Sequence, residues 1–199
     1  MLQSSMPTLL PGFDDPVVAS QQVFRTVLKA LSRPGTVLEM QHLPESPAPL
    51  LPASAAVLLC LADGDTPIWL NRDLRTPELE RYLRFHCGAS LVHDPDSAVF
   101  GCVSRWDQFS LPEFTPGDDL YPDRSATLIL QVSGLEEGRG KRLMGPGIAT
   151  DRLLHVEGVG ERFWKEMAMN RSLFPLGVDV ILATRDSIAG LPRTIMAGK

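Results

Sequence analysis

The stretch Ala126-Thr127-Leu128-Ile129-Leu130-Gln131-Val132 carries the strongest β-strand signal in this chain. Its residues are almost continuously apolar instead of alternating with polar ones, which is typical of a strand covered on both faces. Residues 178–183 have the same character, and residues 67–70 and 98–103 add two shorter apolar runs. Together these runs predict a sheet that is buried between other elements of the protein.

A helix is predicted directly after Asp15, which can cap its first turn, with Pro16 at the first helical position. The helix should end at Ser32-Arg33-Pro34-Gly35, because proline cannot continue it. Apolar residues recur at helical spacing along it and predict the face that it buries, which comprises Phe24, Val27, Leu28 and Leu31.

Three further helices alternate with the apolar runs. Residues 53–62 are too apolar for a surface element and predict a buried helix. Thr76-Pro77-Glu78 repeats the helix-start signal, and residues 161–169 have apolar residues at helical spacing. The side chains expected to face the core from these last two helices are Leu79, Tyr82, Leu83, Phe163, Trp164 and Met167. Helices that alternate with apolar strands indicate an α/β class with a mixed sheet.

The connecting segments are rich in turn residues, since the chain has 16 glycines and 17 prolines among 199 residues. We expect residues 133–140 to form a glycine-rich turn before a returning strand at 141–144. Residues 104–125, with three prolines, should form the longest loop or insertion. Residues 1–13 are predicted to be a flexible N-terminal arm, and residues 14–199 a single α/β domain.

The overall charge and hydropathy exclude several classes of protein. The net charge of −5 disfavours a protein that coats nucleic acid, because such proteins neutralise phosphates with many basic residues. The longest apolar run, residues 55–62, falls far short of the roughly 20 residues that a membrane helix needs. Three widely spaced cysteines favour the reducing cytoplasm over a disulfide framework.

No complete nucleotide-binding motif is present. The stretch from Gly134 to Lys141 resembles a phosphate loop, but its glycine spacing is wrong, and Arg142 stands where a hydroxyl is needed. Two glutamates in the stretch would also repel phosphate. A hairpin turn is the simpler interpretation of this segment.

The residues that bind metals or act as nucleophiles are equally scattered. The four histidines and three cysteines form neither an HExxH nor a CxxC pattern, so no metal site is predicted. Cys87 with His86 or His93 could form a reactive thiol pair, although cysteines in such runs are mostly small buried hydrophobes. The arginines at 72, 75, 81 and 84 could bind an anion, but neighbouring acids make a salt-bridged surface the simpler interpretation.

Several segments, taken in their order and spacing, resemble the PhnH family, a subunit of the bacterial carbon–phosphorus lyase system. The resemblance runs from about residue 14 to residue 195 and is absent from residues 104–125. It is carried by Phe24-Arg25, Lys29-Ala30-Leu31-Ser32, Pro34-Gly35, Leu58-Leu59-Cys60-Leu61-Ala62-Asp63, Asp65-Thr66-Pro67, Trp69-Leu70, Leu83-Arg84-Phe85-His86, the stretch at 126–132, Phe174-Pro175-Leu176-Gly177, Asp179 and Pro192-Arg193-Thr194.

The resemblance implies a role in the use of organophosphonates as a phosphorus source. With PhnG, PhnI and PhnL, the family is required to transfer the ribose triphosphate of ATP to an alkylphosphonate, with release of adenine. Its members form homodimers and join a larger assembly with PhnG, PhnI and PhnJ. The fold that it implies is a three-layer α/β/α sandwich, similar to pyridoxal-phosphate-dependent transferases but without that cofactor, so we expect no cofactor and no metal.

The family has no established catalytic residues to carry over, so the catalytic residues stay unknown. The best-matching segments hold Asp65, Trp69, Arg84, His86 and Arg193, which we predict to line a ligand pocket or a subunit interface. Hydrogen bonds within the core and turns would explain the same residues equally well.

The leading functional expectation is a cytoplasmic subunit with a structural or co-catalytic role, which is not catalytic alone. Two alternatives stay open. One is a free-standing enzyme that acts on a phosphonate or nucleotide in an arginine-lined pocket, and the other is a module that binds such a molecule without turnover.

Overall fold

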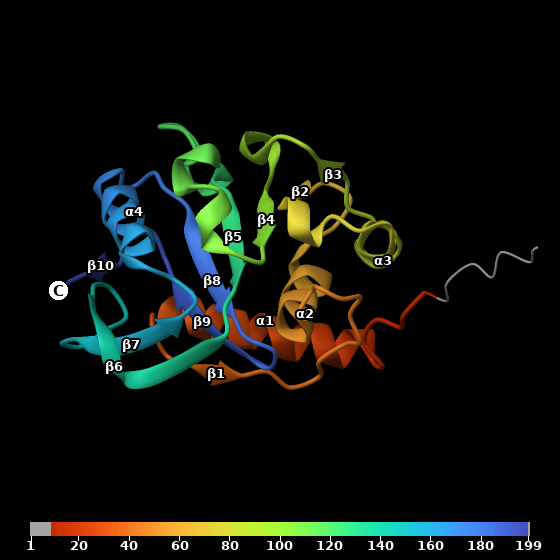
Figure 1. Ribbon diagram of the computed structural model, residues 1–199, viewed down its shortest axis with the longest axis horizontal. Coiled ribbons are helices and arrows are strands. Elements are labelled where there is room, and N and C mark those ends of the chain that lie inside the picture. Colours follow the sequence, from red (N-terminus) through yellow and green to blue (C-terminus); the bar gives the residue numbers. More distant parts are fainter. Residues whose placement is uncertain (1–8, 199) are drawn as a thin grey trace, which may run out of the picture.

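In the computed structural model, which describes residues 9–198, these residues form a mixed α/β fold around a seven-stranded sheet (Figure 1). The strand order is β1-β9-β8-β5-β4-β2-β3. Strands β2, β3, β4, β5 and β8 pair in parallel, whereas β9 and β1 add an antiparallel edge. The bounds are β1 Leu38–Glu39, β2 Ile68–Leu70, β3 Leu91–Val92, β4 Phe100–Val103, β5 Thr127–Gln131, β8 Asp179–Ala183 and β9 Ser187–Leu191.

Both faces of this sheet are covered, as the apolar character of β5 predicts. Ile129 belongs to one hydrophobic cluster, while its neighbours Leu128 and Leu130 belong to the other. Strand β8 divides in the same way, with Ile181 in the first cluster and Leu182 in the second. Because successive side chains of a strand point to opposite faces, the two clusters lie on opposite sides of the sheet.

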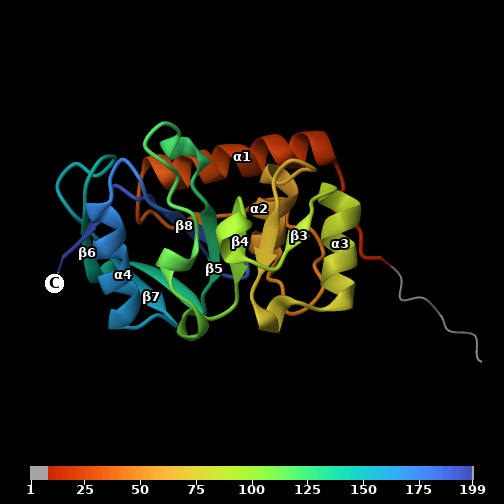
Figure 2. The same cartoon turned by 90° about the horizontal axis from the view of Figure 1, so that it is seen from above.

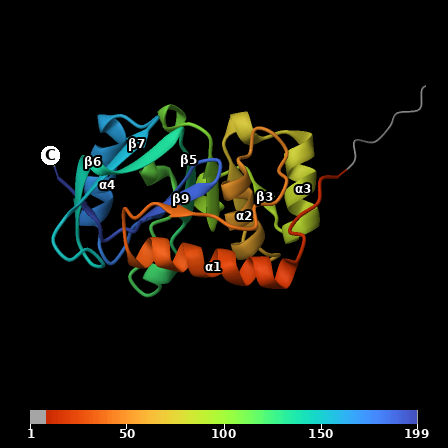
Figure 3. The same ribbon diagram turned by 90° about the horizontal axis from the view of Figure 1, so that it is seen from below.

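Helices α1 (Pro16–Ser32), α2 (Pro52–Leu61) and α3 (Pro77–Cys87) contribute to the first cluster. Helix α4 (Glu161–Ser172) covers the other side, together with a three-stranded sheet of β6 (Gly134–Met144), β7 (Arg152–Glu157) and β10 (Met196–Ala197). Figure 2 shows α1 and α4 on opposite sides of β5 and β8. Seen from below, α1 lies along one side of the molecule (Figure 3). None of the helices in residues 9–198 is long and apolar enough to cross a membrane.

The predicted start of α1 is confirmed, since the Asp15 carboxylate accepts hydrogen bonds from the amides of Val17 and Val18, both at 3.1 Å. Thr76 caps α3 in the same way, because its hydroxyl oxygen accepts from the Leu79 amide at 3.2 Å. These side chains satisfy amides that the first turn of a helix leaves unpaired.

The predicted buried face of α1 is partly wrong. Val27 is buried, but Phe24 and Leu28 are 51% and 57% exposed. The buried face is instead made of small residues, namely Ala19, Val23, Val27 and Ala30. The physical reason lies in strand β9, where a Cβ at Gly190 would stand only 2.5 Å from the Ala30 carbonyl oxygen. The helix therefore packs backbone to backbone on the strand, and only small side chains fit between them.

The predicted turn at residues 133–140 is also wrong, because strand β6 runs through it from Gly134 to Met144. The register of β6 against β7 shifts between Glu137 and Lys141, where the glycines absorb an irregularity of the pairing. Gly140 has φ +90°, and a Cβ there would lie 2.5 Å from the Leu154 carbonyl oxygen, so only glycine fits.

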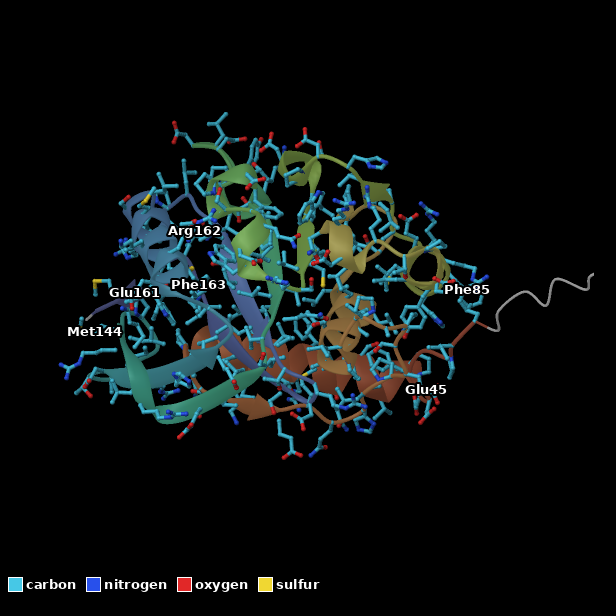
Figure 4. All side chains as sticks on the ribbon, viewed as in Figure 1. Glu45, Phe85, Met144, Glu161, Arg162 and Phe163 are labelled. Atoms are coloured by element: carbon cyan, nitrogen blue, oxygen red, sulfur yellow. The ribbon has the colours of Figure 1, made fainter. Side chains whose placement is uncertain are left out.

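Residues 104–125 are an ordered cover of the second cluster rather than an open loop. They contain short 3₁₀ turns at Trp106–Gln108, Leu111–Glu113 and Pro122–Arg124. Their buried side chains are Trp106, Phe109, Leu111 and Phe114. Figure 4 shows Arg162 and Phe163 side by side on α4, and these two bind this segment. The Phe163 ring meets that of Trp106 at 4.8 Å, and the Arg162 guanidinium donates to the Phe109 carbonyl at 3.0 Å.

Of the predicted N-terminal arm, residues 1–8 lie outside the described residues. Residues 9–13 are placed, and Leu9, Leu10 and Phe13 pack against the first cluster. The division of the chain into an arm and one domain stays a prediction.

Candidate functional site

The five residues predicted for a pocket or interface have separate partners. Within residues 9–198, no hydrogen bond, ion pair or ring contact joins any two of Asp65, Trp69, Arg84, His86 and Arg193. Asp65 is exposed in the turn before β2, and its amide donates to the Asp63 carboxylate at 3.0 Å. Whether these residues bind a ligand or partner stays a prediction.

Arg193 holds together the edge of the sheet at which the parallel strands begin. Its guanidinium donates to both carboxylate oxygens of Asp179, at 3.3 and 2.6 Å, and to the Ser125 hydroxyl. It also donates to the carbonyl oxygens of Pro122, at 2.7 Å, and Pro175, at 3.4 Å. With its donors engaged inside the protein, this arginine ties together three separate stretches of chain.

Trp69 lies in strand β2 and packs against the segment formed by residues 104–125. Its ring makes edge contacts with Phe109 and Phe114, with centroids 6.0 and 5.4 Å apart. Its indole N–H donates to the His93 carbonyl oxygen at 3.1 Å. Both ends of the side chain are therefore satisfied by the fold itself.

Arg84 and His86 lie on α3 and do not share a partner. Arg84 is exposed and pairs with Glu80 at 3.0 Å, one helical turn away, as the sequence predicts. His86 Nε2 lies 3.0 Å from the Leu10 carbonyl oxygen, so the ring fixes the segment that enters α1.

The cysteines are not arranged for nucleophilic chemistry. Burial raises the pKa of Cys87 to about 12, and burial likewise raises the pKa of Cys102 to about 12. The pKa of Cys60 is raised by burial as well. Because the thiolate is the reactive form, these values disfavour the thiol pair considered for Cys87.

A different set of polar side chains converges at the opposite edge of the sheet, where the parallel strands end. A cavity of about 530 Å³ lies there, and we call it the carboxyl-edge pocket. Each of three parallel strands supplies lining residues from just beyond its last position: Ser104, Arg105, Trp106 and Asp107 after β4, Val132 and Ser133 after β5, and Arg185 after β8. Leu51, Gln131 and Gly158 complete the lining.

The charged groups of this pocket are not equivalent. Arg105 donates to both oxygens of the Asp107 carboxylate, at 3.2 and 2.5 Å, and this pairing lowers the pKa of Asp107. Arg185 is exposed, and its side chain has no ion pair or hydrogen bond within residues 9–198. The pocket therefore presents one unpaired positive charge.

The sequence contains a signal for this pocket that motif searching misses. Ser104, Ser133 and Arg185 all stand directly or almost directly after an apolar strand. In an open α/β sheet, the residues that follow parallel strands meet at one edge, and ligands bind there.

Two apolar surfaces lie away from both edges. On α1, Val17, Phe24 and Leu28 form an exposed row, and we call it the α1 row. On the other side of the protein, Met169 and Leu173 border an apolar cavity of about 370 Å³ between α4 and the insertion. Phe85 is a further exposed aromatic residue, and Figure 4 shows it on the outer side of α3.

The described residues include no group of three or more histidine, cysteine or acidic side chains that could hold a metal ion.

Residues 11–197 match the model of a family described as bacterial phosphonate metabolism protein (PhnH). The chain is 37% identical over 189 residues to "Alpha-D-ribose 1-methylphosphonate 5-triphosphate synthase subunit PhnH" of Rhizobium meliloti (strain 1021), covering 92% of each protein. It is 32% identical over 176 residues to "Putative C-P lyase subunit protein HtxG" of Stutzerimonas stutzeri, covering 87% of this chain and 83% of that protein.

Proposed function

Because the chain belongs to the PhnH family of bacterial phosphonate metabolism proteins, we propose that it is a subunit of a carbon–phosphorus lyase system. The observation that carries this proposal is the match to the synthase subunit along 92% of both chains. We assign it a structural or co-catalytic part in the transfer of ribose triphosphate from ATP to an alkylphosphonate. The reaction as a whole belongs to the complex.

We propose that the α1 row is the surface that a partner subunit covers. Exposed apolar side chains at helical spacing are typical of a protein that is incomplete alone. Arg25 and Lys29 run beside the row and form no ion pair with any of residues 9–198, and α1 contains no acidic residue. Two copies of this helix would repel each other, so the row fits an apolar ridge bordered by acidic residues on a different subunit.

We further propose a homodimer, a cytoplasmic location, and the three-layer fold of pyridoxal-phosphate-dependent transferases without the cofactor. The free state of all three cysteines supports the location. The engagement of Lys141 by Glu161 at 3.1 Å leaves few lysines for a Schiff base. Pyridoxal phosphate added to the purified chain should therefore give no aldimine absorption band.

Reconstitution tests the subunit role directly. The chain is purified and mixed with PhnG, PhnI and PhnL of the same bacterium, and adenine release from ATP plus methylphosphonate is measured. We expect release only in the complete mixture, and light scattering of the same samples reports the assembly. Light scattering of the chain alone tests the homodimer. Adenine release by the chain alone, or by the partners without it, would contradict the proposal.

A further inference from the structure

We propose that the carboxyl-edge pocket binds the phosphoryl or phosphonyl group of a substrate, with Arg185 as the residue that holds the anion. This inference deepens the proposed function and rests on it for the identity of the substrate. The chemistry of the pocket itself, an excess of hydrogen-bond donors with one free positive charge, points to an oxyanion.

Arg185 is held in place although its side chain is free. It lies in the turn between the paired strands β8 and β9, and the Ala53 amide donates to its carbonyl oxygen at 3.2 Å. The next carbonyl, of Asp186, accepts from the Met40 amide at 2.7 Å. A guanidinium carried on a fixed backbone loses less freedom when it binds a ligand, and its forked donors match the oxygens of a phosphoryl group.

Trp106 supplies a second and independent observation. It lines the pocket, is only 4% exposed, and its indole N–H has no hydrogen-bond partner among residues 9–198. An indole N–H can only donate, and a buried donor without a partner is costly, so native proteins rarely leave one. A ligand acceptor that reached this N–H from the pocket would satisfy it. The Ser133 hydroxyl on the same wall likewise makes no hydrogen bond within residues 9–198.

The acceptors around the pocket are already occupied. Asp107 is engaged by Arg105 through both carboxylate oxygens. The Gln131 side-chain oxygen accepts from the Leu51 amide at 2.6 Å, and its nitrogen donates to the Pro49 carbonyl at 3.1 Å. The donors that remain, on Arg185, Trp106 and Ser133, therefore lack acceptors within the part of the chain that the structure describes.

The place and size of the pocket agree with this ligand. It lies at the carboxyl ends of β4, β5 and β8. The neighbouring pair β2 and β4 forms the topological switch point of the sheet, because the chain leaves β2 toward one edge and β4 toward the other. Ligands of open α/β sheets bind at such points. A volume of about 530 Å³ falls in the range of small-molecule sites, so a phosphorylated sugar or nucleotide fits better than a bare phosphate.

Titration calorimetry of the full chain tests the proposal, with ATP, methylphosphonate and inorganic phosphate as separate probes. We expect saturable binding of at least one probe. Arg185→Ala should weaken it about ten- to a hundredfold, as for loss of charge-assisted hydrogen bonds. Trp106→Phe, which keeps the ring and removes the N–H, should weaken it several-fold. Arg33→Ala is the matched control, because it removes an exposed arginine that lies outside the pocket and makes no side-chain hydrogen bond or ion pair within residues 9–198, and it should leave the affinity unchanged.

The outcomes separate the ligand source and the two proposals. Binding of ATP alone identifies a nucleotide triphosphate as the source of the oxyanion, and binding of methylphosphonate identifies the phosphonate. The inference is overturned if no probe binds, or if a folded Arg185→Ala chain binds as tightly as the parent. Adenine release by a reconstituted complex whose PhnH subunit binds none of the probes would overturn the inference and leave the proposed function intact. If the chain binds a probe but contributes nothing to adenine release, the proposed function is overturned and the inference about the pocket stands.

Discussion

Replacing Arg193 with alanine should lower the free energy of unfolding by about 3 kcal/mol. The guanidinium makes two bonds to the Asp179 carboxylate, and hydrogen bonds to charged groups contribute about 1.5–3 kcal/mol each. Removing one partner of a buried ion pair costs about 3–5 kcal/mol because the other charge is left unpaired. The side chains are 14% and 22% exposed, so water screens part of that cost, and we take the lower end of the range.

Urea unfolding of the purified chain, followed by circular dichroism, measures this loss. For a chain of this length, each kcal/mol lowers the melting temperature by about 2–4 °C, so calorimetry should show a decrease of about 10 °C. Arg193→Lys should recover little of the loss, because an ammonium cannot reproduce the forked contacts. Arg25→Ala, at an exposed and unpaired arginine, should change the unfolding free energy by less than about 0.5 kcal/mol.

A double-mutant cycle decides whether the ion pair is the cause. Asp179→Ala and the double variant should give a coupling energy of about 2 kcal/mol between the two side chains. A loss below about 1 kcal/mol for Arg193→Ala, or a coupling near zero, would refute the reasoning. Arg193 would then be free for the ligand or interface role that its sequence context predicts.

Three further predictions follow from the packing, the thiols and the α1 row. In urea unfolding, Gly190→Ala should destabilise the fold by about 3 kcal/mol or more, because the new Cβ would stand 2.5 Å from the Ala30 carbonyl oxygen. Gly160→Ala should change the stability little, because a Cβ at that position meets no described atom within 4 Å. Equal effects of the two substitutions would contradict the backbone contact. Burial raises the pKa values of Cys87 and Cys102 to about 12, so both thiols should resist iodoacetamide at pH 8 in the native chain and react after denaturation. Mass spectrometry measures the labelling, and rapid labelling of the native chain would refute this prediction. Phe24→Glu, at a half-exposed position, should cost less than about 1 kcal/mol of stability yet abolish co-elution with partner subunits in gel filtration. Phe85→Glu on α3 should leave co-elution intact. Co-elution of both variants would exclude the α1 row as the interface.

Local signals in the sequence predict the elements of this fold well. Asp15 with Pro16, and Thr76 with Pro77, place the starts of α1 and α3, because capping depends only on neighbouring residues. The almost continuous apolar run at residues 126–132 correctly predicts a strand buried on both faces.

Signals that depend on distant residues fail. The apolar spacing along α1 predicts a buried face that is only partly right, since the sequence of the helix cannot reveal that Gly190 lets the strand approach its backbone. The glycines in β6 indicate a turn, although they serve an irregular pairing with β7.

The same contrast applies to the candidate site. The family resemblance selects Arg193, whose donors are taken up inside the fold. The carboxyl-edge pocket is assembled from residues that follow three different strands, so Arg185 and Trp106 become candidates only when the strand order is known.

The contact of Ala30 with Gly190 also constrains how the protein is made. Helix α1 is synthesised well before the strand on which it packs, since the contacting residues Ala30 and Gly190 are 160 positions apart in the chain. At typical rates of translation, on the order of ten seconds or more separate the two segments. During that time the helix emerges from the ribosome with both its small-residue face and the α1 row uncovered. The nascent chain should therefore be a substrate for chaperones until β8 and β9 have left the ribosome.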